Sequence, residues 1–200
     1  MNKYKLLIFI VFGLFFFSIS INMVLKNYNF TKAYKIGQVV DSMNNVMIYY
    51  NGSVEHITGR NLTKDNYNLG LKYQCVEFIK RYYFQHLKHK MPVSSGNAID
   101  YFDKELRDGE KNCQRNLIQY KNSSKSKPAV DDIIVFSGSF FNKFGHVAIV
   151  SNVSEDEIEI IQQNPGKYAK SRKIFTLKHT DDLWKIDNKH VLGWLRKVNK

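Results

Sequence analysis

The sequence predicts an α+β domain that follows one apolar N-terminal segment. Two hundred residues suit a single domain of ordinary size with a short appendage. A stripe of apolar residues at helical spacing lies between Gln74 and about Leu87. After Asp132 the pattern changes to short runs of β-forming residues separated by turns. Helices in the first half and an antiparallel β meander in the second half indicate an α+β domain whose N-terminal helices pack on the sheet.

The N-terminal segment has the length of a membrane span. Residues 1–5 carry two lysines, and residues 6–25 contain no charged side chain. About twenty apolar residues span the hydrocarbon core of a bilayer as a helix. Ser18–Ser20 fits a small-x-small cleavage site poorly, which favours an uncleaved anchor over a secretion signal. We therefore expect a membrane anchor or signal at residues 1–25, a linker at 26–35 and an extracytoplasmic domain at 36–200, which is secreted if the segment is cleaved.

Each element of the domain has its own local pattern. Two strands joined by an Asn-containing turn come first, at residues 36–40 and 46–50. Residues 56–70 are polar and loop-like, and residues 98–106 indicate a second helix after the one at 74–87. Residues 107–128 are Ser- and Lys-rich and indicate an exposed loop. Five strands are expected after it, at residues 132–136, 144–153, 157–161, 175–177 and 191–195.

The composition narrows the class of function. The net charge of +12 is spread along the chain and favours anionic partners such as lipid headgroups or acidic wall polymers. It comes without a helix-turn-helix, zinc-finger or aromatic–basic RNA motif, so we expect no nucleic-acid partner. The two cysteines, Cys75 and Cys113, do not make a disulfide framework, and the six histidines lack metal-ligand spacing. We expect no metal and no organic cofactor.

Cys75 is the candidate nucleophile. It falls at the first turn of the predicted helix, where free N–H groups and the helix dipole lower the pKa of a thiol. A buried structural cysteine is the alternative. The preceding Gln74, however, offers an amide that can donate to an oxyanion together with the N–H of Cys75. Cys113 lies in the polar 107–128 segment without such a neighbour, and we expect it to be incidental.

His146 is the candidate base. It follows Gly145 at the start of an apolar strand, whereas the other five histidines lie in polar or basic stretches. The turn after this strand predicts a hairpin whose returning strand ends in Gln162, Gln163 and Asn164. Alternation places Gln162 and Asn164 on one face. At least one of these amides is then placed to hold the imidazole in its productive tautomer.

These segments resemble the CHAP superfamily of papain-like cysteine amidases. The resemblance is carried by Tyr-Gln-Cys-Val-Glu-Phe around Cys75, Gly-His-Val-Ala-Ile-Val around His146, the Gln-Gln-Asn run and Leu-Gly-Trp-Leu near the C-terminus. The motifs occur in order from about Ile36 to Arg196, and within the superfamily they are most similar to the amidase domain of glutathionylspermidine synthetase/amidase. The resemblance implies a papain-like fold, with Cys75 as the nucleophile and His146 as the general base.

The third catalytic position departs from that family. Its members usually have Glu-Gln-Asn where this chain has Gln162, Gln163 and Asn164, so the resemblance puts Gln162 in the place of a carboxylate. An amide can fix the tautomer of His146 but cannot neutralise an imidazolium, and Asn164 stays a second candidate for this role. The implied reaction is acyl transfer through a thioester. His146 would act as base toward the Cys75 thiol and as acid toward the leaving amine.

The substrate is left open between two classes. The resemblance implies a polyamine conjugate, glutathionylspermidine, cleaved to glutathione and spermidine. An exported, anchored and basic domain instead favours the stem peptides of peptidoglycan, which many CHAP domains cut. Two alternatives are not enzymes. One is a catalytically weak CHAP-fold binding module, in case Gln162 disables the site, and the other is a membrane-tethered interaction protein whose basic face binds lipid or wall polymer.

Overall fold

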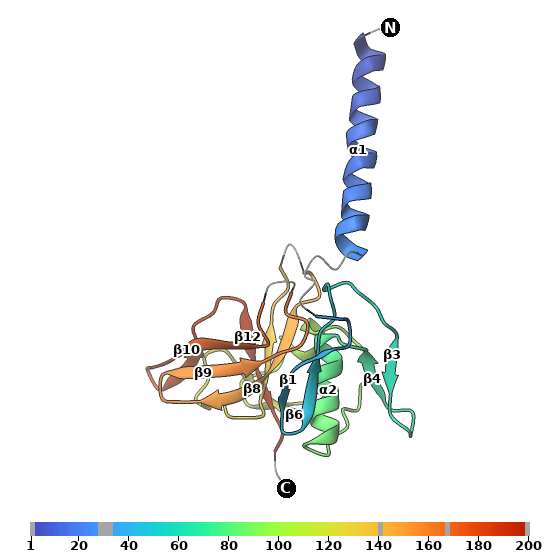
Figure 1. Cartoon of the computed structure of the whole chain (residues 1–200). Helices are drawn as coiled ribbons and strands as arrows, with labels where there is room; N and C mark the ends of the chain where they lie inside the picture. The colour runs from blue at the N-terminus through green and yellow to red at the C-terminus, as the bar shows by residue number, and fades with distance from the viewer. Residues whose placement is uncertain (1–2, 28–33, 140–141, 167–168, 199–200) are drawn as a thin grey trace.

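The α+β class is confirmed, with fewer helices than the sequence predicts. The computed structural model describes residues 3–27, 34–139, 142–166 and 169–198. Within these ranges a long N-terminal helix, α1 (Lys3–Asn27), precedes a domain in which α2 (Cys75–Gln85) packs against antiparallel strands (Figure 1). The expectation of several packed N-terminal helices is wrong, because α2 is the one α-helix in the described part of the domain.

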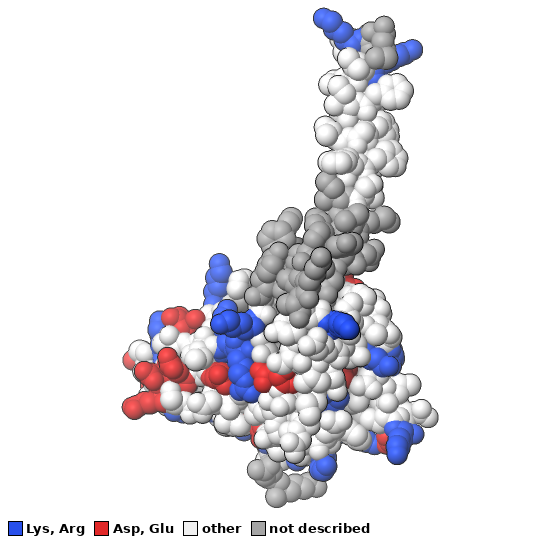
Figure 2. All heavy atoms as spheres, viewed as in Figure 1, with Lys and Arg blue, Asp and Glu red and all other residues white. Residues whose placement is uncertain are grey.

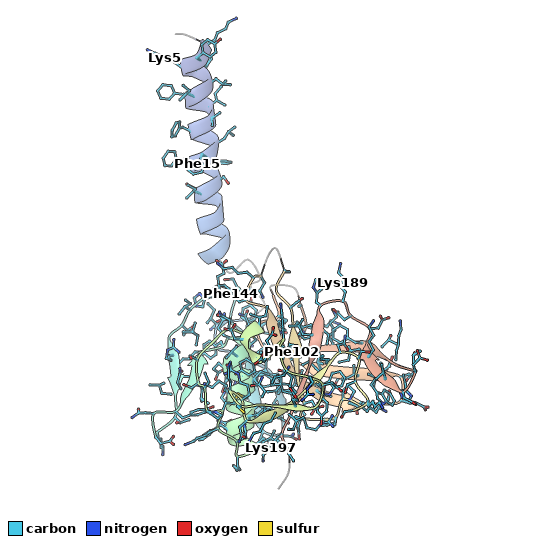
Figure 3. The ribbon with its side chains drawn as sticks, turned by 180° about the vertical axis from the view of Figure 1, so that it is seen from behind. Lys5, Phe15, Phe102, Phe144, Lys189 and Lys197 are labelled. Carbon is cyan, nitrogen blue, oxygen red and sulfur yellow. The ribbon has the colours of Figure 1, made fainter. Side chains whose placement is uncertain are left out.

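Helix α1 is apolar on every side. The side chains of residues 3–20 are all exposed, and Figure 2 shows a largely uncharged shaft with lysines at its tip. Phe15 points away from the helix axis in Figure 3. By length and composition the Lys3–Ser20 window is able to cross a membrane, but a signal sequence passes the same test. The anchor at residues 1–25 therefore stays a prediction, and most of the linker at 26–35 lies outside the described residues.

The scaffold of the domain is a large antiparallel sheet. Its strand order is β11–β10–β9–β8–β7–β12–β6–β5, and two small hairpins, β1–β2 and β3–β4, lie beside it. The strands are β1 (Val39–Met43), β2 (Val46–Tyr49), β3 (Arg60–Leu62), β4 (Asn68–Leu71), β5 (Glu110–Asn112), β6 (Leu117–Lys121), β7 (Ile133–Phe136), β8 (His146–Val153), β9 (Glu157–Ile161), β10 (Arg172–Thr180), β11 (Leu183–Ile186) and β12 (Val191–Arg196).

Strand β8 shows why the second half of the sequence is so apolar. Val147 and Ile149 belong to a cluster that includes the buried face of α2, whereas Ala148 and Val150 belong to a second cluster on the other face of the sheet. A strand that is buried on both faces needs a continuous apolar run. The second cluster is enclosed because the sheet curls, and Ser124 beyond β6 forms a bridge with Trp184 of β11.

Three predicted segments differ from the structure. The predicted loop at 56–70 holds the β3–β4 hairpin, and the predicted loop at 107–128 holds β5 and β6. The helix expected at 98–106 is only a 3-10 turn, η1 (Ile99–Tyr101). The reason is a buried arginine, Arg115, whose guanidinium donates to the carbonyls of Val93, Ser95 and Asp100. These bonds hold the approach to η1 in an irregular path.

The start of α2 is fixed by backbone geometry. Tyr73 has a φ of 66°, so the chain turns sharply just before the helix. Gln74 is extended, with φ −84° and ψ 158°, and its carbonyl accepts the first helical bond from the N–H of Phe78 at 3.2 Å. Glu77 in the first turn complements the positive end of the helix dipole. Cys75 thus becomes the first helical residue, as the sequence predicts.

A buried ion pair joins α2 to the rest of the domain. Glu77 and Arg81 are i,i+4 neighbours with side chains only 2% and 6% exposed, and Arg81 Nε donates to Glu77 Oε1 at 2.6 Å. Asn61 donates to the same carboxylate oxygen at 2.7 Å, and Gln163 donates to the other at 2.9 Å. Arg81 also donates to the carbonyl of Met47. Segments from β2, β3 and the end of β9 therefore meet on one helix.

This network predicts a large loss of stability in Glu77→Gln. The change leaves the Arg81 guanidinium buried without its counter-charge, which costs about 3 to 5 kcal/mol when one partner of a buried pair is removed. Urea unfolding followed by tryptophan fluorescence measures the loss. Glu110→Gln, which breaks the exposed Arg107–Glu110 pair, is the control and should leave the midpoint nearly unchanged. Equal midpoints for the two variants would contradict the proposed contribution of the buried pair to the free energy of unfolding.

Candidate active site

The structure brings Cys75 and the start of β8 together. The thiol of Cys75 faces the main-chain N–H groups of Val147, Val76 and Cys75 itself, so it lies beside the residue that follows His146. Gly145 is needed for this approach: its φ is 72°, and a Cβ there would come within 2.6 Å of the Phe136 carbonyl oxygen. The Gly-His sequence therefore places the imidazole at the end of the strand.

Figure 3 locates this end of the domain. Phe144, two residues before His146, lies at the same end as Lys189, and Lys197 lies at the opposite end. The N–H of Ile99 donates to the Phe144 carbonyl at 2.9 Å, which ties η1 to the loop that carries His146. The candidate site therefore lies where loops, rather than the middle of the sheet, form the surface.

The contacts of Gln162 define the tautomer of His146. Gln162 Nε2 donates to the carbonyl of Lys170 at 3.0 Å, which turns Gln162 Oε1 toward His146 Nε2 at 3.0 Å. An amide oxygen only accepts hydrogen bonds, so Nε2 of His146 carries the hydrogen. The basic nitrogen is then Nδ1, as a general base requires.

Burial keeps both candidate catalytic groups neutral. Cys75 packs against the apolar cluster that contains α2, and this burial raises the pKa of its thiol to about 11 against the pull of the three N–H groups. Burial also lowers the pKa of His146 to about 4, although the bond to Gln162 works in the other direction. At neutral pH the site thus holds a thiol and an imidazole rather than an ion pair.

Gln74 and Asn164 are joined to each other. Asn164 Nδ2 donates to Gln74 Oε1 at 2.6 Å and to the carbonyl of Val54 at 3.2 Å. Gln74 Nε2 donates to the carbonyls of Val54 and His56 at 3.0 and 2.9 Å. In this arrangement the amide hydrogens of Gln74 are used by the Val54–His56 segment, and the side chain of Asn164 reaches Gln74 rather than His146.

The three amides after β9 thus have three different surroundings. Gln162 contacts His146, Asn164 contacts Gln74, and Gln163 is fully buried against Glu77. The structure places Gln162 beside His146 and does not place Asn164 there. Sequence reasoning missed Lys170, whose carbonyl orients Gln162, because a main-chain acceptor leaves no mark on residue type.

A hollow lies next to Gln162 and Asn164. Its volume is about 520 Å³, and it separates the β1–β2 hairpin from the segment that follows Asn164. Tyr49 and Tyr50 form aromatic walls, and Gln162 closes one side. A space of this size accommodates a small peptide-like group. Gln162 links the hollow to His146, whereas His146 and Cys75 are not among its lining residues.

Neither cysteine has a disulfide or metal partner in the described chain. Cys75 and Cys113 are both free thiols, and Cys113 is exposed. Across the described ranges, no three His, Cys, Asp or Glu side chains gather closely enough to hold a metal ion.

The fold and the candidate site together describe an α+β domain with a cysteine at the start of a helix and a histidine at the start of a neighbouring strand. A family model confirms the resemblance seen in the sequence. The CHAP domain model matches residues 65–164, and the chain therefore belongs to the CHAP family.

Known relatives are larger proteins. The chain is 28% identical over 160 residues to trypanothione synthetase of Crithidia fasciculata, an alignment that covers 74% of this chain and 24% of that protein. It is 28% identical over 153 residues to the bifunctional glutathionylspermidine synthetase/amidase of Escherichia coli K12, covering 68% and 23%. The chain thus spans about a quarter of the length of these relatives.

One solved structure is also similar in part. The crystal structure of Ly7917 matches with a TM-score of 0.37 and 17% identity over 62% of this chain and 53% of that one.

The neutral site predicts slow alkylation of Cys75. Iodoacetamide reacts with thiolates, so a pKa of about 11 should make Cys75 react far more slowly at neutral pH than the exposed Cys113. The rate at Cys75 should rise continuously with pH from neutral to strongly alkaline conditions, because its thiolate fraction keeps growing as the pH approaches and passes the pKa. Peptide mass spectrometry after timed labelling measures both rates. A plateau of fast labelling of Cys75 that begins below pH 7 would show a preformed thiolate–imidazolium pair instead.

Proposed function

We propose that this protein is a cysteine-nucleophile amidase that hydrolyses an amide bond through a thioester acyl-enzyme. The single observation that carries the proposal is the contact of His146 Nε2 with Gln162 Oε1 at 3.0 Å, in a CHAP-family chain whose Cys75 heads the adjacent helix. That contact leaves His146 Nδ1 unprotonated, and the N–H of the next residue, Val147, lies against the Cys75 thiol.

The neutral site favours general-base catalysis. When substrate is bound, His146 Nδ1 removes the proton from the Cys75 thiol as the sulfur attacks the carbonyl carbon of the substrate. The imidazolium then protonates the leaving nitrogen, the C–N bond breaks and the thioester remains. Water, activated by the same nitrogen, hydrolyses the thioester and regenerates the thiol.

The start of α2 supplies the oxyanion donor. The first N–H groups of a helix have no intrahelical acceptor, and that of Cys75 lies next to the sulfur. Gln74 is the second candidate donor. To serve, its amide must exchange the carbonyl of Val54 or His56 for the oxyanion, so its contribution depends on a small movement of the Val54–His56 segment.

Glutathionylspermidine is the first candidate substrate. Support comes from the Escherichia coli relative, whose name refers to both the synthesis and the cleavage of glutathionylspermidine. That name describes a protein about four times longer than the matched part, so the substrate is a proposal for this chain. The hollow beside Gln162 has the volume to take a peptide-like part of such a conjugate.

Peptidoglycan stem peptides are the second candidate. The observation that favours them is α1, whose apolar Lys3–Ser20 window is able to anchor or export the domain. The whole chain has a net charge of +12, and residues 36–200 alone carry 25 Lys and Arg against 18 Asp and Glu, a net charge of +7. An exported domain of this charge is attracted to acidic wall polymers and repels a polycationic leaving group at long range. The catalytically weak binding module is the remaining alternative, and it predicts binding without turnover.

Turnover assays separate these candidates. Full-length protein in detergent is incubated with glutathionylspermidine and, separately, with peptidoglycan, and free amines are measured. We expect release from one of the two, and a loss of at least about a thousandfold in Cys75→Ala because the nucleophile is removed. Cys113→Ala is the matched control and should keep full activity. Binding with no release from either substrate would support the binding module and contradict the amidase.

Changes at Gln162 test its proposed role. Gln162→Ala should lower kcat about tenfold or more, because the Nε2–H tautomer of His146 loses its hydrogen-bond acceptor. Gln162→Glu should raise the pKa of His146 above its value of about 4, since a carboxylate favours the imidazolium. The acid limb of the kcat/KM profile would then move to higher pH. Full activity in Gln162→Ala together with a loss of activity in Asn164→Ala would contradict this role of Gln162 and would indicate that Asn164 orients His146.

A further inference from the structure

The segment that holds Gln162 is itself held by the N-terminal hairpin. Gln162 is bound to this segment twice: its Nε2 donates to the carbonyl of Lys170 at 3.0 Å, and its N–H donates to the carbonyl of Ser171 at 2.8 Å. Ser171 Oγ in turn donates to Asp41 Oδ2 on β1 at 2.7 Å. A continuous hydrogen-bonded path thus runs from β1 to the amide that faces His146.

Arg172 reinforces the same connection. Its Nε donates to Asp41 Oδ2 at 3.0 Å, and its Nη1 donates to Glu159 Oε1 on β9 at 2.9 Å. Its Nη2 also donates to the carbonyl of Ser42 on β1. Acidic and basic side chains accordingly lie side by side over this part of the surface in Figure 2. The hairpin, β9 and the start of β10 are fastened together within a few residues of Gln162.

The charge state of Asp41 supports this connection between β1 and the segment that holds Gln162. Burial works to raise its pKa, but the hydrogen bonds from Ser171 and Arg172 and the Arg172 charge hold it below the ordinary value. Asp41 is therefore a carboxylate at neutral pH and accepts from both neighbours. Its side chain is 20% exposed, so these bonds are partly shielded from water.

We propose that Asp41 and Ser171 are positioning residues for the proposed amidase: they hold the Lys170 carbonyl in place, so that Gln162 presents its oxygen, not its NH2 group, to His146. The effect on catalysis rests on the proposed function, but the effect on the imidazole does not. Without the Lys170 acceptor the amide of Gln162 is free to rotate by half a turn. Its NH2 group would then donate to His146 Nε2 and favour the Nδ1–H tautomer, which has no basic nitrogen for the thiol.

This inference gives the N-terminal hairpin a role in the site. Asp41 and Ser171 both lie outside residues 65–164, the part of the chain that the CHAP model matches. The catalytic pair alone therefore does not make the complete site. Residues before and after the matched region determine which nitrogen of His146 is basic.

The test reads the imidazole directly. Full-length protein in detergent is labelled with ¹⁵N-histidine, and the His146 signal is assigned by its loss in His146→Gln. The ¹⁵N shifts distinguish the two tautomers without any substrate. The variants are Ser171→Ala, Asp41→Asn and Ser171→Thr, and Thr176→Ala and Asp181→Asn are matched controls at exposed positions.

We expect the Nε2–H form in the unaltered chain, in both controls and in Ser171→Thr, which keeps the hydroxyl. Ser171→Ala and Asp41→Asn should show a mixture of tautomers. With an active substrate, kcat should fall about three- to tenfold in these two variants and KM should change less than about twofold, as the loss of one orienting hydrogen bond predicts.

A pure Nε2–H form in folded Ser171→Ala and Asp41→Asn would overturn the proposal. Thermal melting checks folding, and Ser171→Ala, which removes a single hydroxyl, decides the matter if Asp41→Asn loosens the hairpin. The two levels of inference fail separately. A chain without turnover on any substrate contradicts the amidase, whereas the tautomer measurement supports or refutes the positioning role by itself.

Discussion

The buried pair of Glu77 and Arg81 is the interaction on which the site depends. One carboxylate on α2 accepts hydrogen bonds from Arg81, Asn61 and Gln163, and so the helix that carries Cys75 is bound to the segment that carries Gln162. A buried ion pair contributes little net stability when compared with an apolar replacement. Here the pair fixes the position of α2 relative to the end of β9, because these hydrogen bonds form together only in one alignment of the two elements.

The run of three amides after β9 follows from the same constraint. Gln163 is buried, and both polar atoms of its side chain are hydrogen-bonded inside the domain: Oε1 accepts from Tyr49 N–H, and Nε2 donates to the Gln74 carbonyl and to Glu77. With Gln163 fixed, Gln162 faces the opposite side, where His146 lies. Asn164 has a φ of 54°, so the strand geometry ends there and its side chain turns to Gln74. Strand alternation therefore predicts the place of Gln162 but not that of Asn164.

The sequence predicts the elements whose apolar pattern matches their burial. The sequence places α2, β8 and β9 closely, because their apolar stripe or alternation follows the faces that they bury. The sequence predicts a loop where β5 and β6 lie, because the buried residues there include Asn112 and Gln119. Asn112 Nδ2 donates a hydrogen bond to Gln119 Oε1 at 3.0 Å. In a sequence, polar residues of this kind predict a loop rather than a strand. The same limit applies to the site: Cys75 and His146 have recognisable neighbours, whereas the Lys170 carbonyl and Asp41 act through tertiary contacts.

The amide of Gln162 is consistent with the burial of Cys75 and His146, the proposed catalytic pair. Where relatives are expected to have a carboxylate, a second carboxylate oxygen would face the Lys170 carbonyl at the position that Gln162 Nε2 now fills at 3.0 Å. The amide fits this carbonyl and supports an uncharged imidazole, whose pKa of about 4 and thiol partner's pKa of about 11 both reflect burial. In the proposed reaction, a site without a preformed ion pair becomes charged only as the substrate is attacked. In that reaction the N–H groups at the start of α2 stabilise the developing negative charge, so the proposed chemistry depends on the helix that Glu77 and Arg81 hold in place.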